Sequence, residues 1–175
     1  MADPKTPRVR ILMRIKDVLD NADLAGLSGT ANVTVRHTRH RWANVEERPC
    51  ISLRMVSDEP DDDYHGMQER RNMLAVDMQI DADLQTEDSE LDPTGLERLS
   101  AIANAALQVL KAKEPRAEDP AGATIYDVCD EIVDLGVQSD DDNEADEGRF
   151  IHRIIVLYRT AIEDPNLLLA EGENL

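Results

Sequence analysis

The sequence predicts an α+β protein, a two-layer sandwich in which two main helices pack on one face of a mainly antiparallel sheet. Two segments place apolar residues at helical spacing, and several shorter segments alternate apolar and polar residues as strands do. The chain has 175 residues, the usual length of one domain, and no internal repeat. We therefore expect a single domain over residues 1–162, followed by a C-terminal extension over residues 163–175.

The first predicted element is an amphipathic helix from Val9 to Leu24, which ends near the turn-forming residue Gly26. Its apolar residues lie on one side, whereas polar residues such as Arg10 and Arg14 lie on the other. A short strand around Val33 and Val35 is expected to follow the turn.

Two strands are predicted after Pro49, with an exposed acidic loop over residues 58–66 between them. The first strand alternates from Cys50 to Met55. The second, over residues 74–83, is expected to bury one face and to expose an acidic one. The acidic face contains Asp77, Asp81 and Asp83.

The second half of the chain begins with a helix that has capping-box spacing at Thr94 and Glu97 and ends near Pro115. A short helical turn at residues 125–132 and then a strand at residues 133–137 should come next. An acidic loop over residues 140–148 leads to an interior strand over residues 150–158. The leucines of residues 167–169 should dock on the body of the protein or on a neighbour.

The composition excludes some classes of function. The net charge is −18, which argues against a DNA-binding protein of the usual basic type. Charge is also unevenly distributed, because ten Lys/Arg and six Asp/Glu precede residue 57, a net charge of +4, while the remainder has a net charge of −22. Aromatic residues make up only 3% of the chain, so few platforms for stacking bases exist.

Cys50 and Cys129 match no metal-ligand spacing, and free thiols in a reducing cytosol are the favoured interpretation, with a disulfide left open. The apolar stretches are too short to span a bilayer, and no signal peptide is evident, so we expect no membrane segment and no secretion.

One basic cluster combines His37 and His40 with Arg36, Arg39 and Arg41. A nucleic-acid contact or a metal site is conceivable there. However, histidines three residues apart on a strand point to opposite faces, so a solvated or intersubunit surface is favoured.

Carboxylates at residues 61–63, with His65, have the chemistry to hold Mg²⁺ or Ca²⁺, although a solvated loop is as simple an explanation and a much commoner one. The loop from Asp140 fails the test for a calcium-binding EF-hand, because Ala145 and Ile151 replace the required Gly and Glu. No phosphate-binding glycine loop or nucleophile elbow is present. We therefore predict neither catalytic residues nor cofactors, and we expect a protein that is not an enzyme.

The order of these elements resembles the tail terminator (tail completion) family of long-tailed bacteriophages, whose members are small α+β proteins. Three features support the resemblance: the opening helix, the segment Leu135-Gly136-Val137 before an acidic tip, and the closing strand that ends Leu157-Tyr158-Arg159-Thr160. The long acidic loops and the C-terminal leucines depart from the family pattern.

The resemblance implies a homohexameric ring in the tail-neck region of the virion, assembled in the host cytoplasm. The ring would stop polymerisation of the tail tube protein. It would also provide a docking surface for a head-tail adaptor or head completion protein. Genomic DNA would pass through its lumen without specific binding. A ring needs two different, complementary surfaces on each subunit. The candidate intersubunit basic residues are Arg10, Arg14, Arg36, Arg39 and Arg41. The candidate lumen or rim acidic residues are Asp77, Asp81, Asp83, Asp140, Asp141, Asp142 and Glu144.

Three alternatives remain open from the sequence. The chain could be a different head-tail neck or adaptor protein, a metal-dependent hydrolase built from His37, His40 and residues 61–63, or an acidic mimic of DNA.

Overall fold

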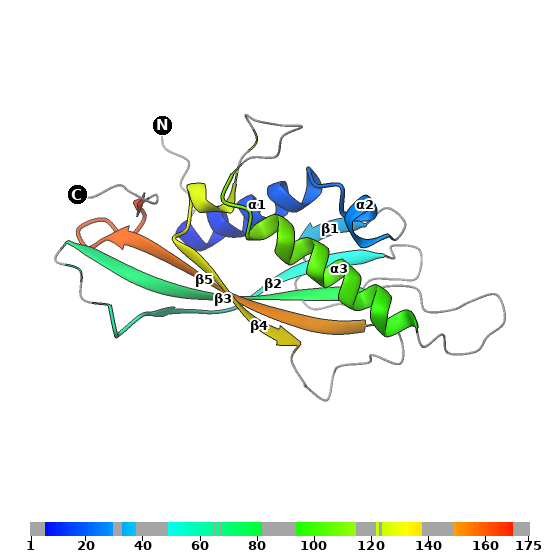
Figure 1. The fold of residues 1–175 in the computed structure, drawn as a ribbon. Coiled ribbons are helices and arrows are strands. Elements are labelled where there is room, and N and C mark those ends of the chain that lie inside the picture. The colour runs from blue at the N-terminus through cyan, green and yellow to red at the C-terminus, as the bar shows by residue number, and fades with distance from the viewer. Residues whose placement is uncertain are drawn as a thin grey trace.

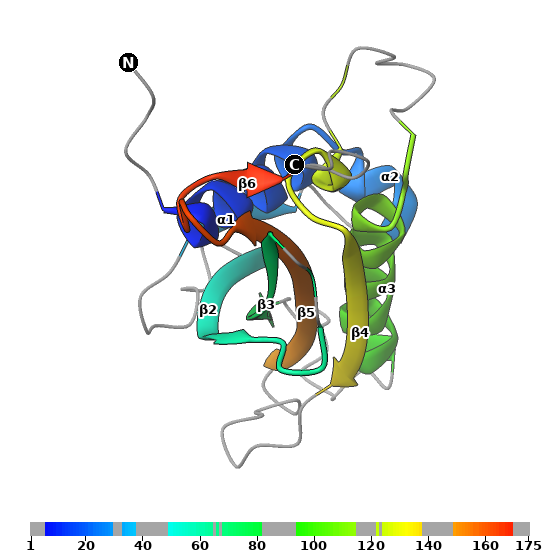
Figure 2. The same cartoon turned by 90° about the vertical axis from the view of Figure 1, so that its left-hand side faces the viewer.

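A computed structural model gives the fold of the chain and describes residues 6–29, 33–37, 49–64, 66, 68–81, 94–114, 122, 124–137 and 149–169. The fold is α+β, as the sequence predicts, and the described residues form three α-helices and one mixed sheet (Figure 1). The sheet is curled, as Figure 2 shows. The more specific expectation of a two-layer sandwich stays a prediction.

Two helices form where one was predicted. Helix α1 spans Pro7–Asp20, and α2 spans Leu24–Ser28. The backbone and side-chain N–H groups of Asn21 both donate to the Asp17 carbonyl at the C-terminal end of α1, and the next N–H, that of Ala22, bonds only three residues back, to Leu19. Asp23 then accepts a hydrogen bond from the Gly26 N–H and starts α2. The helical spacing of apolar residues continues from α1 into α2, so this spacing alone did not reveal the break between them.

The other elements follow the predicted order. Helix α3 spans Thr94–Leu110, and the 3-10 helix η2, Ile125–Asp127, precedes β4, Glu131–Val137, in the order of turn and strand that the sequence predicts. The remaining strands are β1 (Thr34–His37), β2 (Cys50–Pro60), β3 (Glu69–Asp81), β5 (Arg149–Ala161) and β6 (Leu168–Leu169).

The strand order is β1-β2-β3-β5-β4, and β1 pairs with β2 in parallel whereas the other pairs are antiparallel. Strand β3 pairs with one edge of β5 along its full length. Strands β4 and β6 therefore share the other edge of β5, with β6 beyond the point where β4 begins. Leu168 and Leu169 are buried, so this part of the C-terminal extension docks on its own chain.

One hydrophobic core lies between the helices and one face of the sheet, which we call the helix face. Ile11 and Ile15 of α1, Leu99 and Ile102 of α3, and alternate residues of the central strands belong to the same cluster. Helix α1 contacts β1 and β2, and α3 contacts β3 and β5. Alternation along the strands places the remaining side chains on the opposite face, which we call the second face. In the described part of the chain, no helix is long and apolar enough to cross a membrane.

Candidate functional site: the second face of the sheet

The second face falls into three zones along β3. Neighbouring residues in the register of β2, β3 and β5 point to the same side, so each row across the strands is a set of adjacent side chains. The row through Asp77 is buried and charged, the rows through Ala75 and Met73 are apolar, and the row through Arg71 is charged again.

The buried zone is centred on Asp77, whose side chain is 0% exposed. Arg153 Nε and Nη2 donate to its two carboxylate oxygens at 2.6 and 3.1 Å, and Arg54 Nη2 lies 3.4 Å from Oδ2. Both arginines are directly opposite Asp77 in the register, on β5 and β2. The bidentate contact from Arg153 offsets part of the cost of removing the carboxylate from water.

This zone corrects one prediction. Asp77 and Asp81 were expected on an exposed acidic face that borders a channel, but both are completely buried. Polar and apolar residues do alternate in β3, yet the second face is covered at this end of the strand. Asp83 lies outside the described residues.

The middle zone is an apolar strip of half-buried side chains in two adjacent rows. One row runs from Glu59 through Met73 and Leu157 to Glu131, so the outer strands place an exposed glutamate at each end. The next row runs from Ser57 to Val133. The strip consists of Met73, Ala75, Val133, Ile155 and Leu157.

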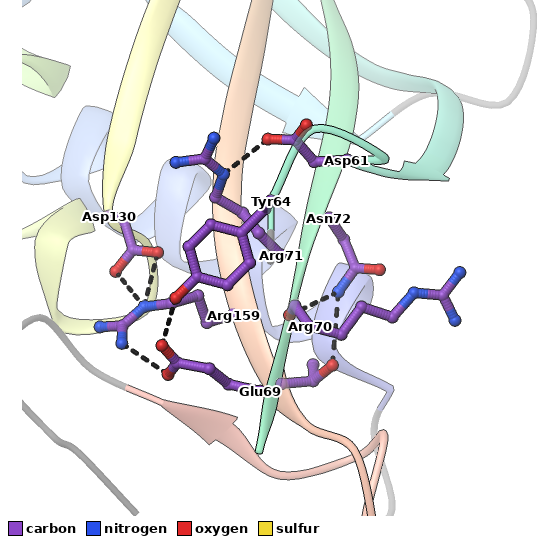
Figure 3. Close-up of polar contacts among 9 residues, drawn as sticks. Asp61, Tyr64, Glu69, Arg70, Arg71, Asn72, Asp130 and Arg159 are labelled. Carbon is purple, nitrogen blue, oxygen red and sulfur yellow. Dashed lines mark hydrogen bonds and ion pairs between the residues drawn. The ribbon is translucent and has the colours of Figure 1, made fainter. Parts of the chain in front are cut away.

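The third zone is an ionic network at the end of the β2–β3 hairpin (Figure 3). Arg71 and Arg159 are cross-strand neighbours, and each has its own carboxylates. Arg71 Nε donates to Asp61 at 2.6 Å. Arg159 donates through Nε to both oxygens of Asp130, at 3.0 and 2.9 Å, and through Nη1 to Glu69 at 2.7 Å.

Tyr64 closes this network. Its hydroxyl donates to Glu69, and the Arg71 guanidinium lies over its ring at 4.8 Å. The Tyr64 hydroxyl is the main cause that lowers the pKa of Glu69, and the same bond raises the pKa of Tyr64. Hydrogen bonding to Asp130 is the main cause that raises the pKa of Arg159. On the helix face at the same end, buried Tyr158 donates to Asp58 at 2.8 Å, so the hairpin is fixed from both sides.

The outer surface of α1 is a second candidate. Val9 and Met13 are 39% and 37% exposed and lie one turn apart. Arg8 and Arg10 are also exposed, on either side of Val9 around the helix. Arg14, predicted as an intersubunit residue, is half-buried and lies 3.7 Å from Asp127 of η2.

The basic cluster around His37 is only partly described. Arg36 is half-buried and its Nε donates to Ser52 at 2.8 Å, which ties β1 to β2, and His37 is exposed at the end of β1. Arg39, His40 and Arg41 lie outside the described residues. The acidic residues Asp140, Asp141, Asp142 and Glu144 also lie outside them.

The predicted metal-binding residues are not brought together where they are described. Asp61 accepts from Arg71, while Asp62 and Asp63 are exposed, and His65 is outside the described residues. Among the residues that the structure describes, no group of three His, Cys, Asp or Glu is arranged to hold a metal ion. Cys50 and Cys129 are buried thiols that are not joined in a disulfide, as the sequence favours.

A His–Asp pair was missed by sequence reasoning. His152 is buried, and its Nε2 lies 2.7 Å from Asp134 Oδ1 on the neighbouring strand. Burial acts to raise the pKa of Asp134, but hydrogen bonds from the Gly136 N–H and from His152 together lower it. Gly136 forms a β-bulge with φ of 73°, and this bulge points its N–H at Asp134. In the sequence, the only sign of this His–Asp pair is Gly136, a glycine within a predicted strand.

Comparisons of the sequence with models of known protein families and with curated proteins find no match.

Proposed function

We propose that this chain is a structural protein of a bacteriophage tail, which forms a hexameric ring, terminates polymerisation of the tail tube and provides the head-docking surface. In this proposal it is not an enzyme, and its function lies in its interfaces. Its site of action is the tail-neck region of the virion, after assembly in the host cytoplasm.

The observation that supports the proposal is that one chain has two different surfaces of complementary character. The exposed side of α1 combines Val9 and Met13 with arginines and has no acidic residue in its first turn. The second face of the sheet has an apolar strip between Glu59 and Glu131. Subunits of a ring use such unlike surfaces head to tail, whereas a twofold dimer uses one surface twice.

The ionic network supports the same proposal. It joins the described residues at the end of the β2–β3 hairpin through five charged side chains and Tyr64, so these side chains are already held in place before any partner binds. A rigid surface loses little conformational entropy on assembly. The partners in this proposal are further copies of the chain, the tail tube protein and a head completion or adaptor protein. The excess of acidic residues would keep the passing DNA from binding.

Deletion of the gene for this chain from its phage tests the proposal. Electron microscopy should then show overlong tail tubes without heads. Tails of normal length without heads would instead indicate a neck adaptor. Purified protein should also show no thermal shift on addition of Mg²⁺, Mn²⁺ or Zn²⁺, and a shift accompanied by hydrolytic turnover would contradict a purely structural role.

A further inference from the structure

We infer that the first two turns of α1 of one copy seat on the apolar strip of the next copy, with Arg8 and Arg10 facing Glu59 and Glu131. This inference rests on the proposed ring and names the contact that would close it. The occupant of the strip is therefore a second copy of this chain.

The apolar strip is an incompletely covered surface. Met73, Ala75, Val133, Ile155 and Leu157 are half-buried, and the described helices pack on the opposite face of the sheet. Apolar side chains in two adjacent rows, bordered by charged residues, are typical of a protein–protein interface.

Spacing along the strands matches spacing along the helix. Val9 and Met13 are four residues apart in α1, a rise of about 6 Å. The two rows of the strip are two residues apart along β3, about 6.8 Å. A helix that runs along the strands can therefore place Val9 over one row and Met13 over the other.

Width and charge match as well. Glu59 and Glu131 are separated by three strand spacings, because β3 and β5 lie between β2 and β4. Measured along the sheet, this path is about 14 Å, which is an upper limit for the straight-line distance because the sheet is curled, and a helix with its side chains is about 10–12 Å wide. Arg8 and Arg10 point to opposite sides of Val9, since successive helical residues are about 100° apart. A helix on the strip thus brings an arginine towards each glutamate.

The proposed contact is head to tail, because it joins two different surfaces of the subunit. In each subunit, α1 and the strip lie on opposite sides of the sheet, so a subunit that offers its helix to one neighbour still offers its strip to another. Repetition of such a contact gives a closed ring when the rotation between subunits closes.

Charge-swapped variants test the contact. One variant has Arg8→Glu and Arg10→Glu, and the other has Glu59→Arg and Glu131→Arg. Each variant alone should sediment as a monomer, because like charges then face each other across the contact. An equal mixture should recover ring assembly, with the two variants alternating, because every contact again joins opposite charges. A control with Glu114→Arg and Glu163→Arg, both exposed positions, changes the charge by the same amount and should assemble as the wild type does.

A cross-link gives a second, independent measurement. A chain with Met13→Cys and Leu157→Cys should form a ladder of disulfide-linked multimers on oxidation, since the two positions lie on opposite sides of the sheet of one chain. The wild-type chain, in which the natural Cys50 and Cys129 are buried, shows how much cross-linking these two cysteines give on their own.

Three outcomes would overturn the inference: assembly of both single variants as in the wild type, a mixture of folded variants that stays monomeric, or a cysteine variant that forms no ladder. A wild-type chain that remains monomeric at its highest soluble concentration would overturn it too. Failure of the proposed function is distinguishable, because it would appear as normal tail length after loss of the gene.

Discussion

Asp77 of β3 and Arg153 of β5 face each other directly in the register, and the arginine donates to both oxygens of a carboxylate that is completely buried. Arg54 approaches the same carboxylate from β2. The Asp77 side chain therefore links three neighbouring strands of the sheet.

Substitution Asp77→Ala should lower the free energy of unfolding by about 3 kcal/mol, at the lower end of the range for breaking a buried ion pair because Arg54 and Arg153 keep some contact with water. The cause is that two guanidinium groups lose their carboxylate without regaining full hydration. Urea denaturation monitored by circular dichroism measures the change. The matched control Asp62→Ala alters an exposed carboxylate and should change stability by less than about 0.5 kcal/mol. Equal effects of the two substitutions would contradict this role of Asp77.

The Tyr64–Glu69 hydrogen bond should make stability fall in acid. The pKa of Glu69 is lowered in the folded state, mainly by the Tyr64 hydroxyl, so its contribution is fully present above the unfolded pKa of about 4.3. The contribution is lost as the pH falls through the lower folded pKa. Tyr64→Phe removes this bond and should therefore reduce the loss of stability between neutral and acidic pH. Urea midpoints measured over that pH range test the prediction, which fails if the two profiles are parallel.

Gly136 should tolerate asparagine better than alanine. Its φ of 73° lies in the left-handed region, and a Cβ there would meet no atom within 4 Å, so the cost of a side chain is conformational and not steric. Gly136→Ala should lower stability by about 1 kcal/mol, and Gly136→Asn by less, because asparagine adopts this region more readily. Gly29, with φ of 68° and equally open surroundings, is a matched position at the end of α2. Thermal unfolding of the four variants should show the same ranking at both glycines.

Neighbouring leucines of the C-terminal segment should behave differently. Leu169 is 3% exposed, whereas Leu167 is 44% exposed. Leu169→Ala should cost about 2 kcal/mol, since it removes side-chain volume that is buried where β6 pairs with β5. Leu167→Ala should be close to neutral. Similar values for both substitutions would mean that β6 adds no packing to the fold.

Helices and strands with a regular spacing of apolar residues could be predicted from the sequence. Helix α3, the turn before β4 and the apolar strand β5 appear where their patterns place them. Strands β2 and β3 also form, but β2 extends to Pro60 and β3 begins at Glu69, so the loop predicted over residues 58–66 was too long. Their pairing with each other carries both strands into a polar segment that has no strand pattern of its own. Docking of the C-terminal leucines on the body of the chain was also one of the two options expected. These features depend on residues close together in sequence, and local patterns record them.

The arrangement of charges could not be predicted in the same way. Alternation in β3 placed Asp77 on a polar face, but its burial depends on Arg153, which is 76 residues away in sequence. Nothing in the local pattern specifies that register. The same holds for Arg159, which joins Asp130 to Glu69, and for His152, which finds Asp134 across a bulge. The apolar strip was missed because its members come from three strands and form a surface only after those strands pair.

The long pairing between β3 and β5 also has a kinetic consequence. Residues 69–81 join residues 149–161, so the centre of the sheet forms only after the chain has closed a very long loop. Contacts of such high sequence separation slow the folding of a domain. Until β5 pairs, the edge of β3 that it occupies in the final sheet has unsatisfied backbone groups, and such an edge favours aggregation of a partly folded chain. Yields of folded protein should therefore depend on temperature and on synthesis rate more than the final stability would indicate.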